Sequence, residues 1–227
     1  MNRFMSRWTI ANTLGWGVGL SLGLILMFDN RLWAWAPTTT VGLSLALLAG
    51  GVATGLGVGA AQWIGWRNPA IPLAGWLASS TAGGVLVYFV TWSTFPLLQT
   101  VDFDMGFVVP LLGAWPGFSL LGHVLGGPLT GLVVGLLMGL AQSTSLNKQM
   151  SSLRWIGIST LAAALGFLVG NLVSWMIPSL FICTSITGLV YGIVSGMLLS
   201  GRTPARWVLS RPDGSTGDAM DDRSNAR

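Results

Sequence analysis

The single histidine of this chain lies where a helix would be interrupted. His123 falls inside an apolar stretch, and Gly126-Gly127-Pro128 follows about one helical turn later. Proline removes a hydrogen bond from a helix and clashes with the preceding turn, so this segment should break or kink. Interrupted helices beside an ionisable residue are where membrane transporters bind solutes. His123, Gly126, Gly127 and Pro128 are therefore the candidate solute-binding or gating residues. A helix that begins late, with His123 in the preceding loop, is the alternative.

The other reactive side chains do not form a catalytic or metal-binding set. Asp102 and Asp104 are the only neighbouring carboxylates outside the C-terminal tail, and this pair alone does not complete a metal site. Cys183 is the only cysteine, so a disulfide framework is excluded. The chain contains no glutamate, and its long apolar segments contain no aspartate that could relay protons. We expect no enzymatic activity and no metal ion.

A bound pigment is an alternative that the neutral side chains leave open. The 12 tryptophans could line a macrocycle. Its axial ligands would come from His123, Asn12, Asn171, Gln62 and Gln142. Close helix packing through glycine leaves little room for such a group, so no cofactor is predicted.

The composition is that of a chain embedded in lipid. Hydrophobic residues make up 52% of the sequence and charged residues 8%, against about a quarter charged in soluble domains, and the mean hydropathy is +0.69. Six segments reach the length of about 20 apolar residues that a bilayer requires. They are Trp8–Phe28, Val41–Ile64, Leu73–Phe95, Ser119–Ala141, Leu153–Ile177 and Ser179–Leu199.

The basic residues predict the orientation of these spans. With the N-terminus in the cytoplasm, ten of the 11 basic residues fall on the cytoplasmic side and only Arg31 falls outside. Such a bias is typical of multi-pass proteins with both termini in the cytoplasm. We therefore expect a bacterial inner membrane, or another energy-transducing membrane, as the location. The +4 net charge then sets topology, and no nucleic-acid partner is expected.

Two patterns alternate along the six segments. The odd-numbered segments open with Trp-x3-[Asn/Ser]-Thr, beginning at Trp8, Trp76 and Trp155. The even-numbered segments carry glycine at every fourth residue, and two of these rows are followed three residues later by glutamine. The rows are Gly51, Gly55, Gly59; Gly131, Gly135, Gly139; and Gly188, Gly192, Gly196, and the glutamines are Gln62 and Gln142. This alternation predicts three repeated hairpins.

Each repeated residue type has a physical role in a membrane. Small residues four apart let two helix backbones approach closely, which is the main attraction between helices in lipid. The polar pair Asn12-Thr13 and its counterparts should bond to their own helix or to a neighbour, with Gln62 and Gln142 as partners. Tryptophan at the start of a span is typical of the aromatic belt at the headgroup level, so the three leading tryptophans are expected there.

The predicted fold is an all-α integral membrane domain over residues 1–201. Six transmembrane helices form three tandem hairpins, at about 8–64, 73–141 and 153–200, related by a pseudo-threefold repeat. Residues 96–118 are apolar and interrupted by proline, which favours a re-entrant or interfacial segment. The tail at 202–227 is polar and should be disordered in the cytoplasm.

Two short motifs resemble those of a known group of proteins. Gly55-Leu-Gly-Val-Gly59-Ala-Ala-Gln62-Trp63 closes one segment, and Trp8-Thr-Ile-Ala-Asn-Thr-Leu14-Gly15-Trp16 opens another. They resemble uncharacterised Gly/Trp-rich multi-pass membrane proteins of bacteria. The resemblance implies the membrane fold over most of residues 8–201, and it implies no activity.

Two functions are consistent with these features. The first is a non-catalytic membrane scaffold or assembly partner, packed through its glycine rows within lipid and against another membrane protein or a second copy. The second is a channel or carrier for a neutral or weakly polar small solute, with its site near the kinked fourth helix. The scaffold is favoured because the packing residues are many and the candidate site residues are few.

Overall fold

The computed structural model describes residues 3–28, 40–67, 70–99, 120–146, 150–177 and 179–200. The expectations for the tail at 202–227, for Asp102 and Asp104 and for most of 96–118 lie outside these residues. The described part is all helical. Its elements are α1 (Arg3–Leu14), a π-helix η1 (Gly15–Leu20), α2 (Ser21–Phe28), α3 (Thr40–Trp66), α4 (Leu73–Gln99), α5 (Leu120–Ser143), α6 (Ser152–Met176) and α7 (Leu180–Ser200).

Six helices in the described residues are long and apolar enough to cross a membrane, which confirms the predicted number of spans. The first is continuous through α1, η1 and α2 and extends to Arg3, five residues before the predicted start. The other predicted boundaries agree with the helix ends to within four residues. Hydropathy located the spans well because apolar length is the property that a bilayer selects.

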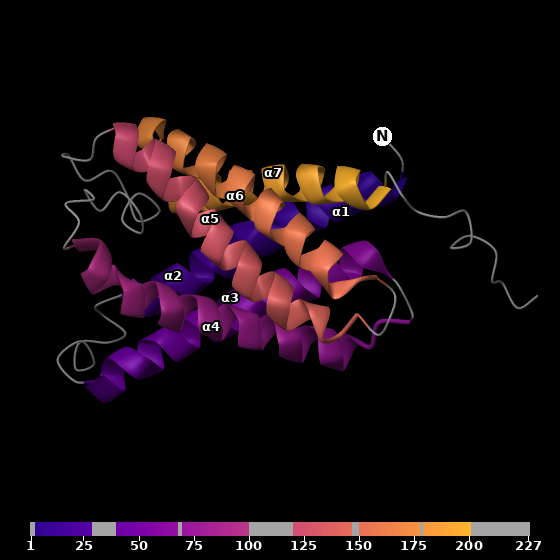
Figure 1. The fold of residues 1–227 in the computed structure, drawn as a ribbon, viewed down its shortest axis with the longest axis horizontal. Coiled ribbons are helices and arrows are strands. Elements are labelled where there is room, and N and C mark those ends of the chain that lie inside the picture. Colours follow the sequence, from indigo (N-terminus) through magenta and orange to yellow (C-terminus); the bar gives the residue numbers. More distant parts are fainter. Residues whose placement is uncertain are drawn as a thin grey trace, which may run out of the picture.

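Contacts between neighbouring spans arrange the six spans as a closed ring. Each span packs against the next one along the chain, and α7 packs back against α1 and η1. The N-terminus, the turn between α3 and α4 and the turn between α5 and α6 lie at the same end of the bundle (Figure 1). Six inward faces therefore meet along one central line, and side chains from distant parts of the sequence come together there.

Glycine brings neighbouring backbones into direct contact around this ring. A Cβ atom at Gly55 of α3 would lie 2.5 Å from the carbonyl oxygen of Ser80 in α4. A Cβ atom at Gly135 of α5 would lie 2.5 Å from the carbonyl oxygen of Ser159 in α6. No side chain fits at such distances, so these helix pairs can approach only because both positions lack one. Close approach increases dispersion contacts and permits Cα–H···O contacts.

The glycine row of α7 packs on α1 in the same manner but in a different register. The space that a side chain at Gly188 would need is taken by the carbonyl oxygen of Asn12, and Gly192 lies against the backbone of Thr9. By sequence spacing, Gly192 is the counterpart of Gly55 and Gly135, yet Gly188 makes the corresponding carbonyl contact. The α7 row is thus displaced by one helical turn.

The first span departs from a regular α-helix at Gly15–Leu20, where it winds as a π-helix. Glycine tolerates this local rewinding, and π-turns leave backbone carbonyls available for other donors. Thr54 of α3 donates to the carbonyl oxygen of Gly19 at 3.3 Å, and the Thr184 hydroxyl of α7 lies 3.2 Å from that of Gly17. The two flanking helices therefore hold the π-turn in place.

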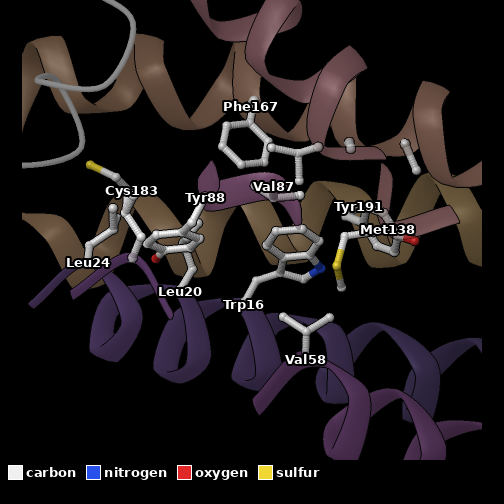
Figure 2. Packing of buried hydrophobic residues seen from close by; sticks show 14 residues of the cluster. Trp16, Leu20, Leu24, Val58, Val87, Tyr88, Met138, Phe167, Cys183 and Tyr191 are labelled. Carbon is white, nitrogen blue, oxygen red and sulfur yellow. The ribbon is translucent and has the colours of Figure 1, made fainter. Parts of the chain in front are cut away.

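The π-helix carries a tryptophan into the middle of the bundle (Figure 2). Trp16 is 2% exposed and packs edge-on against Phe167 of α6, with ring centroids 5.9 Å apart. Val58 of α3 and Met138 of α5 belong to the same cluster, and Tyr191 of α7 lies 5.4 Å from Trp16 between centroids. One aromatic side chain thus joins four other helices across the central line.

We expect Gly135→Ala to destabilise the protein by about 1–3 kcal/mol, the usual cost of overpacking. The new methyl group would lie 2.6 Å from the Cα of Thr160 as well as against Ser159, so α5 and α6 must separate. Thermal unfolding of detergent-purified protein measures the effect.

Gly157→Ala is the matched control, because a Cβ atom at Gly157 meets nothing within 4 Å. It should be neutral or slightly stabilising, since alanine is the better helix former. Equal melting temperatures for the two variants would contradict the packing argument.

Candidate functional site

Four tryptophans meet inside one end of the bundle. Trp8 of α1, Trp76 of α4 and Trp155 of α6 converge around Trp66, the last residue of α3. Trp66 lies 5.5 Å from Trp8, 5.7 Å from Trp76 and 5.4 Å from Trp155 between ring centroids. Most of these pairs are edge-to-face, the arrangement that aligns a ring edge with a neighbouring π-face. The end of the bundle that carries the chain's N-terminus is therefore filled by aromatic rings.

The predicted place of the three leading tryptophans was wrong. Trp8, Trp76 and Trp155 are at most 1% exposed, so their rings pack against one another inside the bundle and do not lie on its outer surface, where an aromatic belt would be. Two indole N–H groups also find protein partners: Trp8 donates to the Ser195 hydroxyl at 2.8 Å, and Trp76 donates to the carbonyl oxygen of Gly59 at 3.0 Å. A tryptophan at a span end can turn inward when a neighbouring helix supplies an acceptor.

One helical turn further into the bundle, polar side chains form a layer. Gln62 of α3 donates to Oδ1 of Asn12 at 3.0 Å, and its own Oε1 accepts from Nε2 of Gln142 at 2.8 Å. Gln142 also donates to the hydroxyl of Ser80 in α4 at 3.0 Å. The predicted partnership of the two glutamines with the Asn/Ser positions is confirmed.

Tyr191 extends the polar layer to the remaining helices. Its hydroxyl lies 3.1 Å from that of Ser159 in α6, and its ring end lies beside the side chain of Gln62. The polar layer, defined as Asn12, Gln62, Ser80, Gln142, Ser159 and Tyr191, therefore takes one residue from each of the six spans.

The layer contains amides and hydroxyls only, so its chemistry is that of hydrogen bonding. Where water is absent, burying an unpaired amide can cost several kcal/mol. Hydrogen bonding between these side chains is therefore strongly preferred. Every side chain of the layer has a partner, although Oε1 of Gln142 itself is unpaired. Elsewhere in the described interior, unpaired buried atoms belong to Thr9, Trp16, Trp155, Thr160 and Asn171. The arrangement can fix the relative register of six helices, because each bond tolerates little displacement.

The predicted site on the fourth span lies on a continuous helix. α5 runs from Leu120 to Ser143 with Pro128 inside it, so His123 belongs to the helix and does not precede it. Gly126 accepts an additional bond at its carbonyl oxygen from the Thr130 hydroxyl at 2.8 Å. Gly127 lies against Asn171 of α6. The structure thus brings α6 to this site, while the His123 side chain lies outside the described residues.

The chain contains one sequence motif known from catalysis, but the motif lacks the local structure in which it is active. Gly19-Leu20-Ser21-Leu22-Gly23 has the Gly-x-Ser-x-Gly spacing of hydrolases, whose serine sits on a sharp turn between a strand and a helix. Ser21 instead begins α2, and its hydroxyl lies 2.8 Å from that of Thr184. The hydroxyl serves helix packing.

Sequence reasoning missed Trp16, Trp66 and Tyr191, although two of them carried a readable signal. Trp16 follows Asn12 by four residues, and Trp66 follows Gln62 by four, so each shares a helix face with a polar residue that needed a buried partner. Tyr191 had no such signal, because its role depends on how α7 is placed beside α3 and α6. The amides of Asn12, Gln62 and Gln142 are engaged in the polar layer and are not directed at a pigment.

Neither a family model, nor a curated protein, nor a solved structure matches this chain. The class of protein therefore rests on its own residues. It is an all-helical, multi-pass membrane protein with six apolar helices in its described part.

Replacing Gln62 and Gln142 tests the polar layer by a double-mutant cycle. We expect Gln62→Leu and Gln142→Leu each to destabilise by about 1–3 kcal/mol, because each leaves buried partners unpaired. The double variant should lose less than the sum, with a coupling of about 0.5–2 kcal/mol. Ser143→Ala removes only an exposed bond and serves as the control. Strict additivity of the two glutamine variants in thermal unfolding would count against a shared network.

Proposed function

We propose that the chain is a non-catalytic membrane scaffold or assembly partner. The observation that carries this proposal is the state of the bundle interior. Three groups of side chains follow one another along the bundle at intervals of about one helical turn: the four tryptophans that meet at Trp66, the polar layer, and the residues packed around Trp16. Each group draws side chains from most of the spans. Interior groups that satisfy one another favour a structural role over catalysis or transport.

The outward faces support the same proposal. They carry large apolar side chains on every span; examples are Val18, Leu56, Leu86, Leu132, Leu161 and Leu189, all at least 40% exposed. Such faces suit contact with lipid or with another transmembrane helix equally well. The bilayer, a second copy or another membrane protein are the proposed partners, and nucleic acid is not.

We further propose that the six spans are three repeated hairpins, at about 8–64, 73–141 and 153–200, related by a pseudo-threefold repeat with a glycine zipper between units. Equivalent packing supports this relation: Gly55, Gly135 and Gly188 each lie against the carbonyl of an Asn/Ser position in the next unit. The convergence of Trp8, Trp76 and Trp155 supports it independently.

The third glycine row is followed three residues later by Leu199, where the other two rows have glutamine. The displaced register of α7 explains this exception. Gln62 and Gln142 each follow the glycine at the carbonyl contact by seven residues, and seven residues after Gly188 is Ser195. Ser195, and not Leu199, is thus the counterpart of the two glutamines by packing. It accepts the Trp8 indole N–H, whereas Tyr191, one turn earlier in α7, lies beside Gln62.

For topology we propose a bacterial inner or other energy-transducing membrane with both termini in the cytoplasm. The ten-to-one distribution of basic residues supports this orientation. Arg7 lies in the first turns of α1, Arg67 directly follows α3 and Arg154 lies in the first turn of α6, at the helix ends that carry the four clustered tryptophans, which supports this orientation.

Photo-crosslinking in native membranes tests the scaffold proposal. A benzoyl-phenylalanine placed at Leu132, Leu161 or Leu189 should give a discrete protein adduct from at least one face, a partner or a second copy. The same probe at Val58, which is 0% exposed, is the control and should give internal crosslinks only. Lipid adducts alone at every outward position, together with a monomer in mild detergent, would contradict a scaffold.

The second candidate function is a channel or carrier for a neutral or weakly polar small solute. Pro128 inside α5 favours it, because a proline within a span removes a backbone hydrogen bond and loosens the helix beside Gly126 and Gly127. His123 lies on the same helix, one turn before Gly127.

For this second function we expect His123→Ala and Pro128→Ala to reduce solute entry severalfold. Swelling of proteoliposomes in urea, glycerol and larger polyols measures the rate by light scattering. Gly157→Ala, on the outward side of α6, is the control and should leave the rate unchanged. Swelling no faster than in protein-free vesicles, or unchanged in both variants, would exclude the carrier.

A further inference from the structure

A buried amide lies where α6 meets the proline-containing helix. Asn171 is 1% exposed and lies one turn beyond Phe167, on the same side of α6. It is directed at α5, since a Cβ atom at Gly127 would lie 2.7 Å from its Nδ2 atom. The absence of a side chain at Gly127 therefore leaves the room that the amide of Asn171 occupies.

Neither polar atom of this amide is paired. Within the residues that the structure describes, both Oδ1 and Nδ2 of Asn171 lack a hydrogen-bond partner. The contrast with Asn12 is direct, because Asn12 is also fully buried and both of its amide atoms are bonded, to Trp8 and to Gln62. A buried amide with a free donor and a free acceptor is costly. Among the described residues, Asn171 alone has two unpaired buried side-chain atoms.

The facing helix adds another acceptor nearby. Pro128 has no backbone N–H, so the carbonyl oxygen of Val124, four residues earlier, receives no helical hydrogen bond from it. Val124 lies one turn before Gly127, the residue that contacts Asn171. The amide of Asn171 thus supplies a donor and an acceptor, and the facing turn of α5 carries a further carbonyl that lacks its helical bond.

We propose that Asn171 and this turn of α5 form a binding site for a hydroxyl group. A hydroxyl accepts one hydrogen bond and donates one, so it can accept from Nδ2 of Asn171 and donate to Oδ1 of Asn171 or to the Val124 carbonyl. The hydroxyl belongs either to an ordered water or to a small neutral organic molecule. No charged ligand is required, because all the protein groups are neutral.

This site does not depend on the scaffold proposal. A bound water would make it a structural joint between α5 and α6, and a bound organic hydroxyl would make it a recognition site in the span that carries His123. The test therefore addresses occupancy first and the source of the hydroxyl second.

An experimental structure of the protein in phospholipid nanodiscs, prepared without added polyol, tests occupancy. We expect a density peak within about 3.2 Å of both Nδ2 and Oδ1 of Asn171. Native mass spectrometry of the same sample separates the two sources: an added mass that Asn171→Ala loses identifies an organic molecule, and a peak without added mass identifies water.

The stability of Asn171→Ala provides a second readout. An occupied site predicts a lower melting temperature than wild type, comparable to that of Asn12→Ala, because a satisfied amide is lost in both. An empty site predicts the opposite, since the variant removes an unpaired polar group. Absence of the density overturns the proposal whatever the melting temperature, as does an Asn171→Ala variant that melts at or above the wild-type temperature.

Discussion

The hydrocarbon core of a bilayer contains no water, and the interior of this bundle is organised by that constraint. Each inward polar side chain must find its partner on another helix or on its own backbone. The polar layer answers this requirement with one residue from every span: Gln62 bonds to both Asn12 and Gln142, and it lies beside Tyr191. A helix displaced by one turn would leave several of these groups unpaired. The layer therefore stabilises one arrangement of the six helices against its alternatives.

Lipid also removes most of the hydrophobic attraction between helices, so close packing has to replace it. The contacts of Gly55 with Ser80 and of Gly135 with Ser159 bring backbones together where any side chain would separate them. The π-helix at Gly15–Leu20 belongs to the same solution. It needs residues that tolerate rewinding, and its freed carbonyls are bonded by Thr54 and lie against Thr184. Polar pairing and glycine packing thus act together, since the hydrogen bonds form only between helices that are already close.

The aromatic residues illustrate how one residue type serves two environments. Trp175 is 53% exposed on the outside of α6, whereas Trp155, at the other end of the same helix, is fully buried. Both lie near a span end, and their local sequences do not separate them. Only the presence of Trp66 from α3 beside Trp155 makes the inward position favourable, because edge-to-face contacts then replace contacts with lipid.

The membrane class, the number and limits of the spans, and the pairing of Gln62 and Gln142 with Asn/Ser positions were all predictable from the amino-acid sequence. Those properties follow from apolar length and from helical spacing, which are local. Three other features depend on how the helices are placed relative to one another. They are the burial of Trp8, Trp76 and Trp155, the position of Tyr191 in the polar layer, and the unpaired amide of Asn171. Each depends on which helix lies opposite and at what height. That choice is made by all the inter-helix contacts together, so no single segment encodes it.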